Sequence, residues 1–194
     1  MNMRKATLVK YIFIFSFFFT NADAVTNNDF LTYRNNEFNF SFWYPKSWRS
    51  VPTTNAETKI KVASNMGNGV DDCNVVAIKR DIFKNMSSKE YLSIAQNGFP
   101  GVLRKQFPDI QFIESGVTTL SNKDAYYIVS EATYKIYKFN APMRSLTVVS
   151  LDSNSKYGIQ YVITCRTTPK RFEVMRPIFK SIISDFVIGQ PYNN

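Results

Sequence analysis

Alternating apolar and polar residues mark a β-strand early in the chain. In residues 37–48 (EFNFSFWYPKSW), every second residue from 38 to 42 is phenylalanine, the period of two of a half-buried strand. The Tyr-Pro pair ends this strand, because proline has no N–H for a strand ladder and keeps the preceding residue extended. A short polar turn then returns the following tryptophan to the sheet edge. The residues that define this segment are Phe38, Phe40, Phe42, Tyr44, Pro45 and Trp48.

Further strands are predicted on both sides of this segment. Residues 30–33 precede it as a short strand. Residues 59–63 alternate lysine with branched residues, so they are expected at a sheet edge, where lysine discourages pairing with other chains. Residues 73–80 form the next strand. Later, residues 110–119, 125–137, 143–151 and 157–165 are separated by short connections rich in turn residues, which predicts an antiparallel meander.

Two helical regions are also predicted. Ser87 and Glu90 have the spacing of a capping box, and apolar residues follow at helical intervals. Gly98 is typical of a helix end, and Pro100 opens either a second helix or a kinked continuation, which Pro108 ends.

The second helical region lies near the C-terminus. Thr168 and Pro169 are typical of a cap and a first helical residue, and Pro177 should kink the helix or split off its first turn. Phe186 and Ile188 then predict a last small strand. The face expected to pack inward consists of Phe172, Met175, Phe179, Ile182 and Ile183.

The elements together predict an α+β fold with an antiparallel sheet of about six to seven strands flanked by helices. The pattern does not decide whether the helix of residues 87–107 shares a face with the C-terminal helix. The chain has 194 residues, with 44% hydrophobic and 15% aromatic residues, which suits a folded core and excludes disorder.

The first residues have the form of an export signal. Residues 1–24 combine a basic start, an apolar run too short to span a bilayer, and Ala22-Asp23-Ala24, a small-x-small cleavage pattern. The short, phenylalanine-rich leader favours a bacterial source, and an uncleaved anchor is the alternative. We therefore expect a signal peptide over 1–24, a single domain over 25–194, and a periplasmic or secreted protein.

The composition limits the catalytic and metal-binding chemistry that the chain can perform. The chain contains no histidine, which excludes Ser-His and Cys-His nucleophile systems and removes the commonest metal ligand. No phosphate loop or nucleophile motif is present. Asp71 and Asp72, with Asn68 and Asn74, could hold calcium, but solvated loop acids are the more ordinary reading. We expect no metal, no cofactor and no enzymatic activity.

Charge suggests the kind of partner. Without residues 1–24 the chain keeps 21 basic and 14 acidic residues, a net charge of +7. A basic exported protein can meet an acidic protein or an anionic surface, or its charge can serve solubility alone. No run of lysine and arginine is dense enough to predict nucleic-acid binding.

One strand interleaves aromatic and basic side chains near its end. Such a rim supplies contact area and charge steering, although an ordinary strand with a core side and a solvent side is the alternative. The candidate binding residues are Tyr134, Lys135, Tyr137, Lys138 and Arg144.

The chain has two cysteines, Cys73 and Cys165, and each lies at the end of a predicted strand. An exported protein meets oxidising conditions, so we expect them to pair as a disulfide; two buried free thiols are the alternative.

The segment at residues 40–48 resembles the opening strand of the PsbP-like superfamily. That superfamily includes PsbP, the Ran-binding Mog proteins and bacterial exported proteins of the DcrB type. The strand order and the closing Ser-Asp-Phe-x-Ile at 184–188 extend the resemblance over residues 29–188. It implies helices on both faces of the sheet and adaptor or assembly roles, and it transfers no catalytic residue.

The sequence therefore predicts an exported, non-enzymatic binding or accessory factor for another macromolecule. A carboxylate-based hydrolase and a periplasmic small-ligand carrier are the alternatives. Two facing carboxylates in a concave site would favour the hydrolase, and a large dry cavity would favour the carrier.

Overall fold

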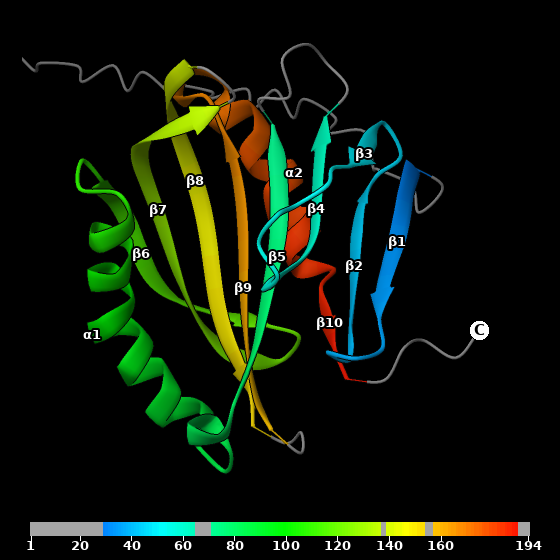
Figure 1. Ribbon diagram of the computed structural model, residues 1–194, viewed down its shortest axis with the longest axis vertical. Helices are drawn as coiled ribbons and strands as arrows, with labels where there is room; N and C mark the ends of the chain where they lie inside the picture. The colour runs from blue at the N-terminus through cyan, green and yellow to red at the C-terminus, as the bar shows by residue number, and fades with distance from the viewer. Residues whose placement is uncertain (1–28, 65–70, 137–138, 154–156, 190–194) are drawn as a thin grey trace, which may run out of the picture.

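A large antiparallel sheet organises the molecule (Figure 1). The computed structural model describes residues 29–64, 71–136, 139–153 and 157–189. The strand order is β3-β4-β5-β9-β8-β7-β6, and the last four strands along the chain form the predicted meander. The strands are β3 (Trp48–Ser50), β4 (Thr58–Ser64), β5 (Asp72–Arg80), β6 (Gln111–Leu120), β7 (Lys123–Ile136), β8 (Phe139–Asp152) and β9 (Gly158–Thr167).

A second, three-stranded sheet holds the first strands of the chain. It consists of β1 (Phe30–Asn35), β2 (Phe40–Pro45) and β10 (Val187–Ile188), with β2 in the centre. The strand predicted at 38–42 therefore begins later. Asn39 has a φ of 50°, and this turn separates Phe38 from β2, although all three phenylalanines are buried.

The lysine-bearing strand is not the edge of the large sheet. β4 pairs with β5 on one side and with β3 on the other, so the prediction of an edge strand at 59–63 is wrong. The edge is β3, which Trp48 begins immediately after the turn. A bulge between Thr58 and Ile60 places the ammonium of Lys59 4.1 Å from the ring centre of Phe38.

The helix α1 (Ser88–Gln106) begins at the predicted capping box and does not break at Gly98. Ser87 accepts a hydrogen bond from the backbone of Glu90, whose carboxylate accepts one from the backbone of Ser87. The helix continues through Pro100 because Phe99 and Leu103 pack with the core on that side of the sheet, and tertiary packing overrides local preference.

The C-terminal helix forms largely as predicted. A short 3₁₀ turn, η3 (Pro169–Arg171), precedes α2 (Phe172–Ser184), and α2 runs on through Pro177. Its buried residues are the five predicted ones, Phe172, Met175, Phe179, Ile182 and Ile183.

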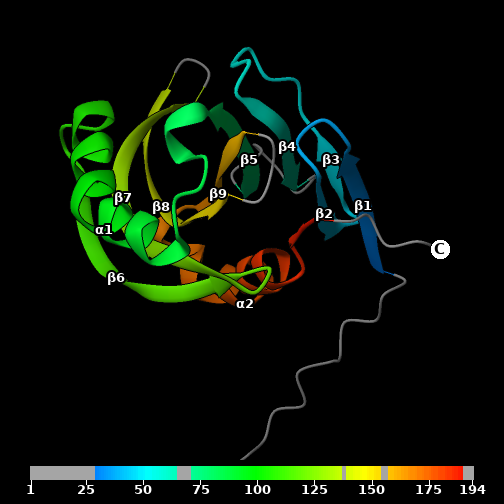
Figure 2. The same ribbon diagram turned by 90° about the horizontal axis from the view of Figure 1, so that it is seen from below.

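The large sheet carries a hydrophobic core on each face, with α1 and α2 on different sides of it (Figure 2). α2 and the small sheet bury one face, where Phe40, Phe42 and Phe186 meet the inner side chains of the strands. α1 packs on the other face at β7 and β8, where Tyr91 and Ala95 lie in one cluster with Ile128 and Val149. Alternate residues of β7 belong to the two cores, as strand geometry requires.

The two cysteines face each other across β5 and β9. Cys73 and Cys165 are register partners, and their sulfur atoms lie 2.04 Å apart at disulfide distance, as the sequence predicted. Both side chains are fully buried on the α2 side.

Candidate functional site

The predicted binding residues gather at one end of the sheet but on both of its faces. Tyr134 belongs to the side of β7 that faces α1, and Arg144 of β8 belongs to the side that faces α2. Lys135 is exposed on β7. Tyr137 and Lys138 lie outside the described residues. We call the described members of this group, Tyr134, Lys135 and Arg144, the rim.

Tyr134 is held between two neighbours. Its ring centre lies 4.4 Å from that of Phe107, just after α1, and 4.6 Å from the guanidinium carbon of Arg166 on β9. Burial raises the pKa of Tyr134 above its usual value, so this phenol stays protonated at neutral pH. Tyr134 is therefore a neutral aromatic side chain packed between α1 and β9.

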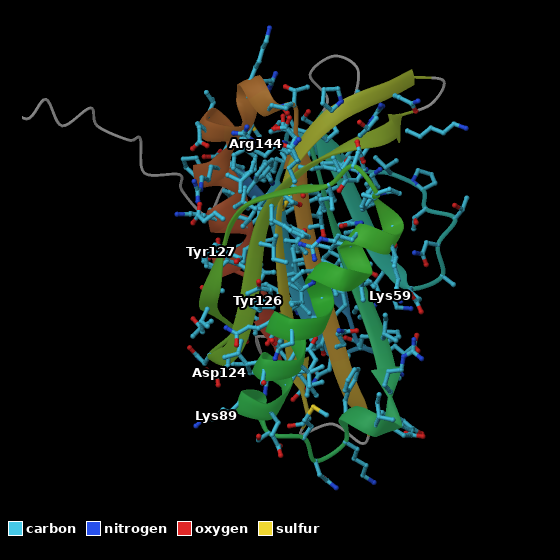
Figure 3. The ribbon with its side chains drawn as sticks, turned by 90° about the vertical axis from the view of Figure 1, so that its left-hand side faces the viewer. Lys59, Lys89, Asp124, Tyr126, Tyr127 and Arg144 are labelled. Carbon is cyan, nitrogen blue, oxygen red and sulfur yellow. A yellow bond between two sulfur atoms is a disulfide. The ribbon has the colours of Figure 1, made fainter. Side chains whose placement is uncertain are left out.

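Arg144 forms ion pairs and a ring contact with other residues of the same chain. Its guanidinium lies 3.0 Å from the carboxylate of Glu131 on β7 and 3.9 Å from that of Glu173 on α2. The same group lies 5.7 Å from the ring centre of Phe172. Figure 3 shows Arg144 beside α2. These contacts tie α2 to the sheet and leave Arg144 less free to meet a partner than Lys135.

The neighbouring strands β4, β5 and β9 have one face that neither α1 nor α2 covers. Figure 1 is seen from this side: β8, β9 and β5 pass in front of α2, and α1 stands beside them rather than across them. Apart from the buried Ala63 and Asp72, side chains of β4, β5 and β9 on this side are partly exposed, whereas those on the opposite side are mostly buried, Lys79 of β5 being an exception. We call these residues the open face: Lys61, Asn74, Val76, Ile78, Gln160, Val162, Thr164 and Arg166.

The strand register and one hydrogen bond show that the open face is on the side of the large sheet that carries α1. Val76 is the register partner of Val162, which packs against the core beneath α1. The amide of Gln160 donates a 2.7 Å hydrogen bond to the hydroxyl of Tyr91 on α1. The open face thus begins where the cover of α1 ends.

The centre of the open face is apolar. Val76 and Val162 pair across β5 and β9, and Ile78 follows two residues further along β5. Leaving these three branched side chains half-exposed in the middle of a sheet forgoes hydrophobic stabilisation of roughly 25 cal/mol per Å².

One end of the open face presents positive charge. The ammonium of Lys61 lies 3.6 Å from the carboxylate of Asp72, and the guanidinium of Arg166 lies 3.0 Å from it. The side chain of Asp72 is only 7% exposed, whereas those of Lys61 and Arg166 are 28% and 20% exposed. Two cations share one buried carboxylate, so the outer surface is positive. Arg166 also touches Tyr134, which makes the open face continuous with the rim.

The two adjacent carboxylates considered for calcium point to different sides. Asp72 pairs with the cations of the open face, whereas Asp71 accepts hydrogen bonds from Thr167 and Arg171 on the α2 side. Both carboxylates are buried and neutralised by protein groups rather than solvated in a loop. They do not converge on a shared oxygen site, and Asn68 lies outside the described residues.

An open depression lies beyond the first turns of α1. It has a volume of about 520 Å³, and its lining includes the exposed side chains of Ile82 and Ile94. The lining contains one carboxylate, that of Glu90, which is already held by the capping box with Ser87. The depression does not supply the two facing carboxylates of a hydrolase.

The residues of the open face were missed by sequence reasoning, although a signal was present. In β9, one set of alternate residues is Ile, Tyr, Ile and Cys, and the other is Gln, Val, Thr and Arg. β5 shows a similar contrast between the apolar run Cys73, Val75 and Ala77, which Lys79 ends, and a mixed set. A mixed set on two adjacent inner strands indicates a sheet face without a covering helix.

The comparisons with known proteins identify the fold. Cyanobacterial PsbP (CyanoP) of Synechocystis sp. PCC 6803 has a TM-score of 0.59 and 12% identity, covering 85% of this chain and 95% of its own. LpqN, involved in cell envelope biogenesis of Mycobacterium tuberculosis, has a TM-score of 0.59 and 12% identity, covering 83% and 91%. The Ran-binding protein Mog1p of Saccharomyces cerevisiae has a TM-score of 0.49 and 7% identity, covering 82% and 95%.

This chain therefore has the PsbP-like fold, and the fold predicted from the opening strand is confirmed. No family model and no curated protein matches the sequence. The likeness lies in the three-dimensional arrangement, at identities that speak for the fold alone.

Proposed function

We propose that this protein is an exported, non-enzymatic accessory factor that binds an acidic protein through the open face and the rim. The observation that carries the proposal is the half-exposed apolar pair of Val76 and Val162 in the middle of the large sheet. On the opposite face of the same two strands, the apolar residues from Cys73 to Ala77 and from Ile159 to Cys165 are buried in the core with α2 and the small sheet.

Charge supports an acidic partner. On the open face, Lys61 and Arg166 present their cationic groups around a buried carboxylate; Lys135 adds an exposed ammonium at the same end of the sheet, on the side that faces α2. An apolar centre with a basic margin fits a partner segment that carries apolar side chains flanked by aspartate or glutamate. The net charge of +7 without residues 1–24 would speed the approach of such a partner.

We propose that the protein has no catalytic activity, because carboxylates that could act in catalysis form ion pairs within the chain. Asp71, Asp72 and Glu131 are each paired with an arginine or lysine rather than facing one another across a cleft. The chain has no histidine to act as a general acid or base.

Export is supported by the signal-like residues 1–24 and by the disulfide between β5 and β9, which suits an oxidising compartment. Within the described part of the chain, no helix has the length and apolarity needed to cross a bilayer.

The proposal is tested by site-specific photo-crosslinking in the host cell. A photoreactive residue replaces Thr164, which is half-exposed on the open face; the control carries it at Val174, which is 75% exposed on the far side of α2. We expect a discrete adduct with one acidic protein from position 164 and none from 174. No adduct from 164, or the same adducts from both positions, would exclude the open face as the binding site.

A further inference from the structure

The outer edge of β6 lacks most of the features that keep strand edges from pairing with other chains. β6 has 10 residues and contains no lysine, arginine or proline. Within the described ranges, no strand pairs with its far side, and Figure 2 shows it running along the outside of the molecule from beside α1 to beside α2. Long edges of this kind are templates for another strand.

The other edges in the described structure are protected. β3 has three residues and carries Arg49, β1 carries Arg34 at one edge of the small sheet, and β10 at its other edge has only two residues. β6 has one protective feature, a bulge between Phe112 and Glu114 near its start. Beyond that bulge, residues 114–120 pair with β7 in an unbroken register, which leaves a regular edge centred on Val117.

The turn after β6 shows which backbone groups point outward. Ser121 and Asn122 have φ values of 51° and 62°, so a two-residue hairpin closes with Leu120 opposite Lys123. In such a hairpin the closing pair exchanges hydrogen bonds, and hydrogen-bonded pairs then recur at every second residue. The N–H and C=O groups of Ser115, Val117 and Thr119 therefore point away from β7.

The side chains of the same three residues are exposed. Val117 is 54% exposed, and Ser115 and Thr119 are also exposed. The strand brings no free charge to this edge, because the carboxylate of Glu114 accepts hydrogen bonds from Arg176 on α2 and from Tyr127 on β7. Tyr127 also covers Gly116, where an added Cβ would lie 2.9 Å from its ring.

We propose that β6 pairs antiparallel with β6 of a second copy of this chain, about a two-fold axis at Val117. This register places Val117 opposite its own counterpart and Ser115 opposite Thr119 of the second copy. A second copy fits because the edge is neutral and self-complementary: branched side chains meet at the axis and hydroxyls pair on either side. β6 lies at the opposite end of the sheet from β4 and β5, so the dimer leaves the open face accessible.

The register is tested by single cysteines in the purified full chain under mild oxidation. Counterparts in a hydrogen-bonded antiparallel pair have Cα atoms about 5.5 Å apart, which suits a disulfide. Val117→Cys should therefore form a crosslinked dimer. In Ser115→Cys the two cysteines would be roughly 13 Å apart along the strands, so we expect at least roughly tenfold less dimer. Mixing Ser115→Cys with Thr119→Cys should restore crosslinking.

The native cysteines do not confuse this test, because Cys73 and Cys165 are fully buried and lie at disulfide distance. In the otherwise unchanged chain, Val117→Lys should abolish the concentration-dependent dimer measured by sedimentation. Val117→Cys that stays monomeric after oxidation, or Ser115→Cys that crosslinks equally well, would overturn the proposal. A partner captured at the open face would leave this result unaffected, so the two proposals can fail separately.

Discussion

At the scale of single residues, Gly158 decides whether two elements can touch. A Cβ at this position would lie 2.3 Å from the Cβ of Phe83 and 2.4 Å from its backbone carbonyl carbon. Phe83 ends the short 3₁₀ turn η2 (Asp81–Phe83), and its ring packs edge-on against Tyr91 at 5.6 Å. Because Gly158 has no side chain, β9 can pack directly against the segment that leads into α1.

This contact predicts opposite effects for two glycine substitutions. Gly158→Ala should lower the free energy of unfolding by roughly 2 kcal/mol, because backbone has to move. Gly101→Ala should raise it by about 0.5–1 kcal/mol, because Gly101 lies in a helix with nothing within 4 Å of an added Cβ. Urea unfolding of both variants checks the pair. Equal stabilities for Gly158→Ala and the unchanged protein would contradict the contact.

The disulfide is the second residue-scale feature. It closes a loop with a sequence separation of 92, so the chain-entropy model gives up to about 4–5 kcal/mol of stabilisation. Unfolded, unreduced protein should show no reactive thiol, and Cys73→Ala with Cys165→Ala should unfold at lower denaturant concentration. Two reactive thiols before reduction would rule the bond out.

At the scale of elements, the sequence predicted those features that depend on residues close together in the chain. The capping box at Ser87, the four-strand meander and the buried face of α2 were all visible in the sequence. The helix end predicted at Gly98 was wrong, and the sequence left open whether Pro100 opens a second helix or continues the first, because only packing against the sheet decides that. The separate small sheet and the open face were also missed, since both depend on which strands meet across long stretches of chain.

One ion pair that joins two elements predicts a pH dependence. Hydrogen bonds from Arg176 and then from Tyr127 lower the pKa of Glu114, which links β6 to α2 and β7. A carboxyl whose pKa is lower in the folded state stabilises fully above its unfolded pKa of about 4.3, and this stabilisation is lost as pH falls through the folded value.

The chain should therefore lose stability between about pH 5 and pH 3 more steeply than Glu114→Gln. Thermal unfolding across that range measures both slopes. At neutral pH the variant should be the less stable protein. Because the Glu114 side chain is 40% exposed, the difference should also shrink in high salt. Parallel acid slopes for the two proteins would contradict this role of Glu114.

At the scale of the whole molecule, the signal-like start, the disulfide and the basic surface agree with a protein that works outside the cytoplasm. The signal pattern ending in Ala22-Asp23-Ala24 predicts cleavage before Val25. Intact-mass analysis of the exported protein should give a chain that begins at Val25. A mass that still includes Met1 would contradict cleavage before Val25.

Binding of a partner to the open face is tested most directly by the affinity of that partner for two variants that carry the same substitution on different surfaces. Val162→Asp places a carboxylate at the apolar centre of the open face, and Val174→Asp places the same group on the exposed side of α2. With the partner obtained by crosslinking, Val162→Asp should weaken binding by roughly 2 kcal/mol or more, about thirtyfold, at low and high salt. Val174→Asp should bind like the unchanged protein. Full affinity for a folded Val162→Asp protein, or equal losses in both variants, would contradict the account.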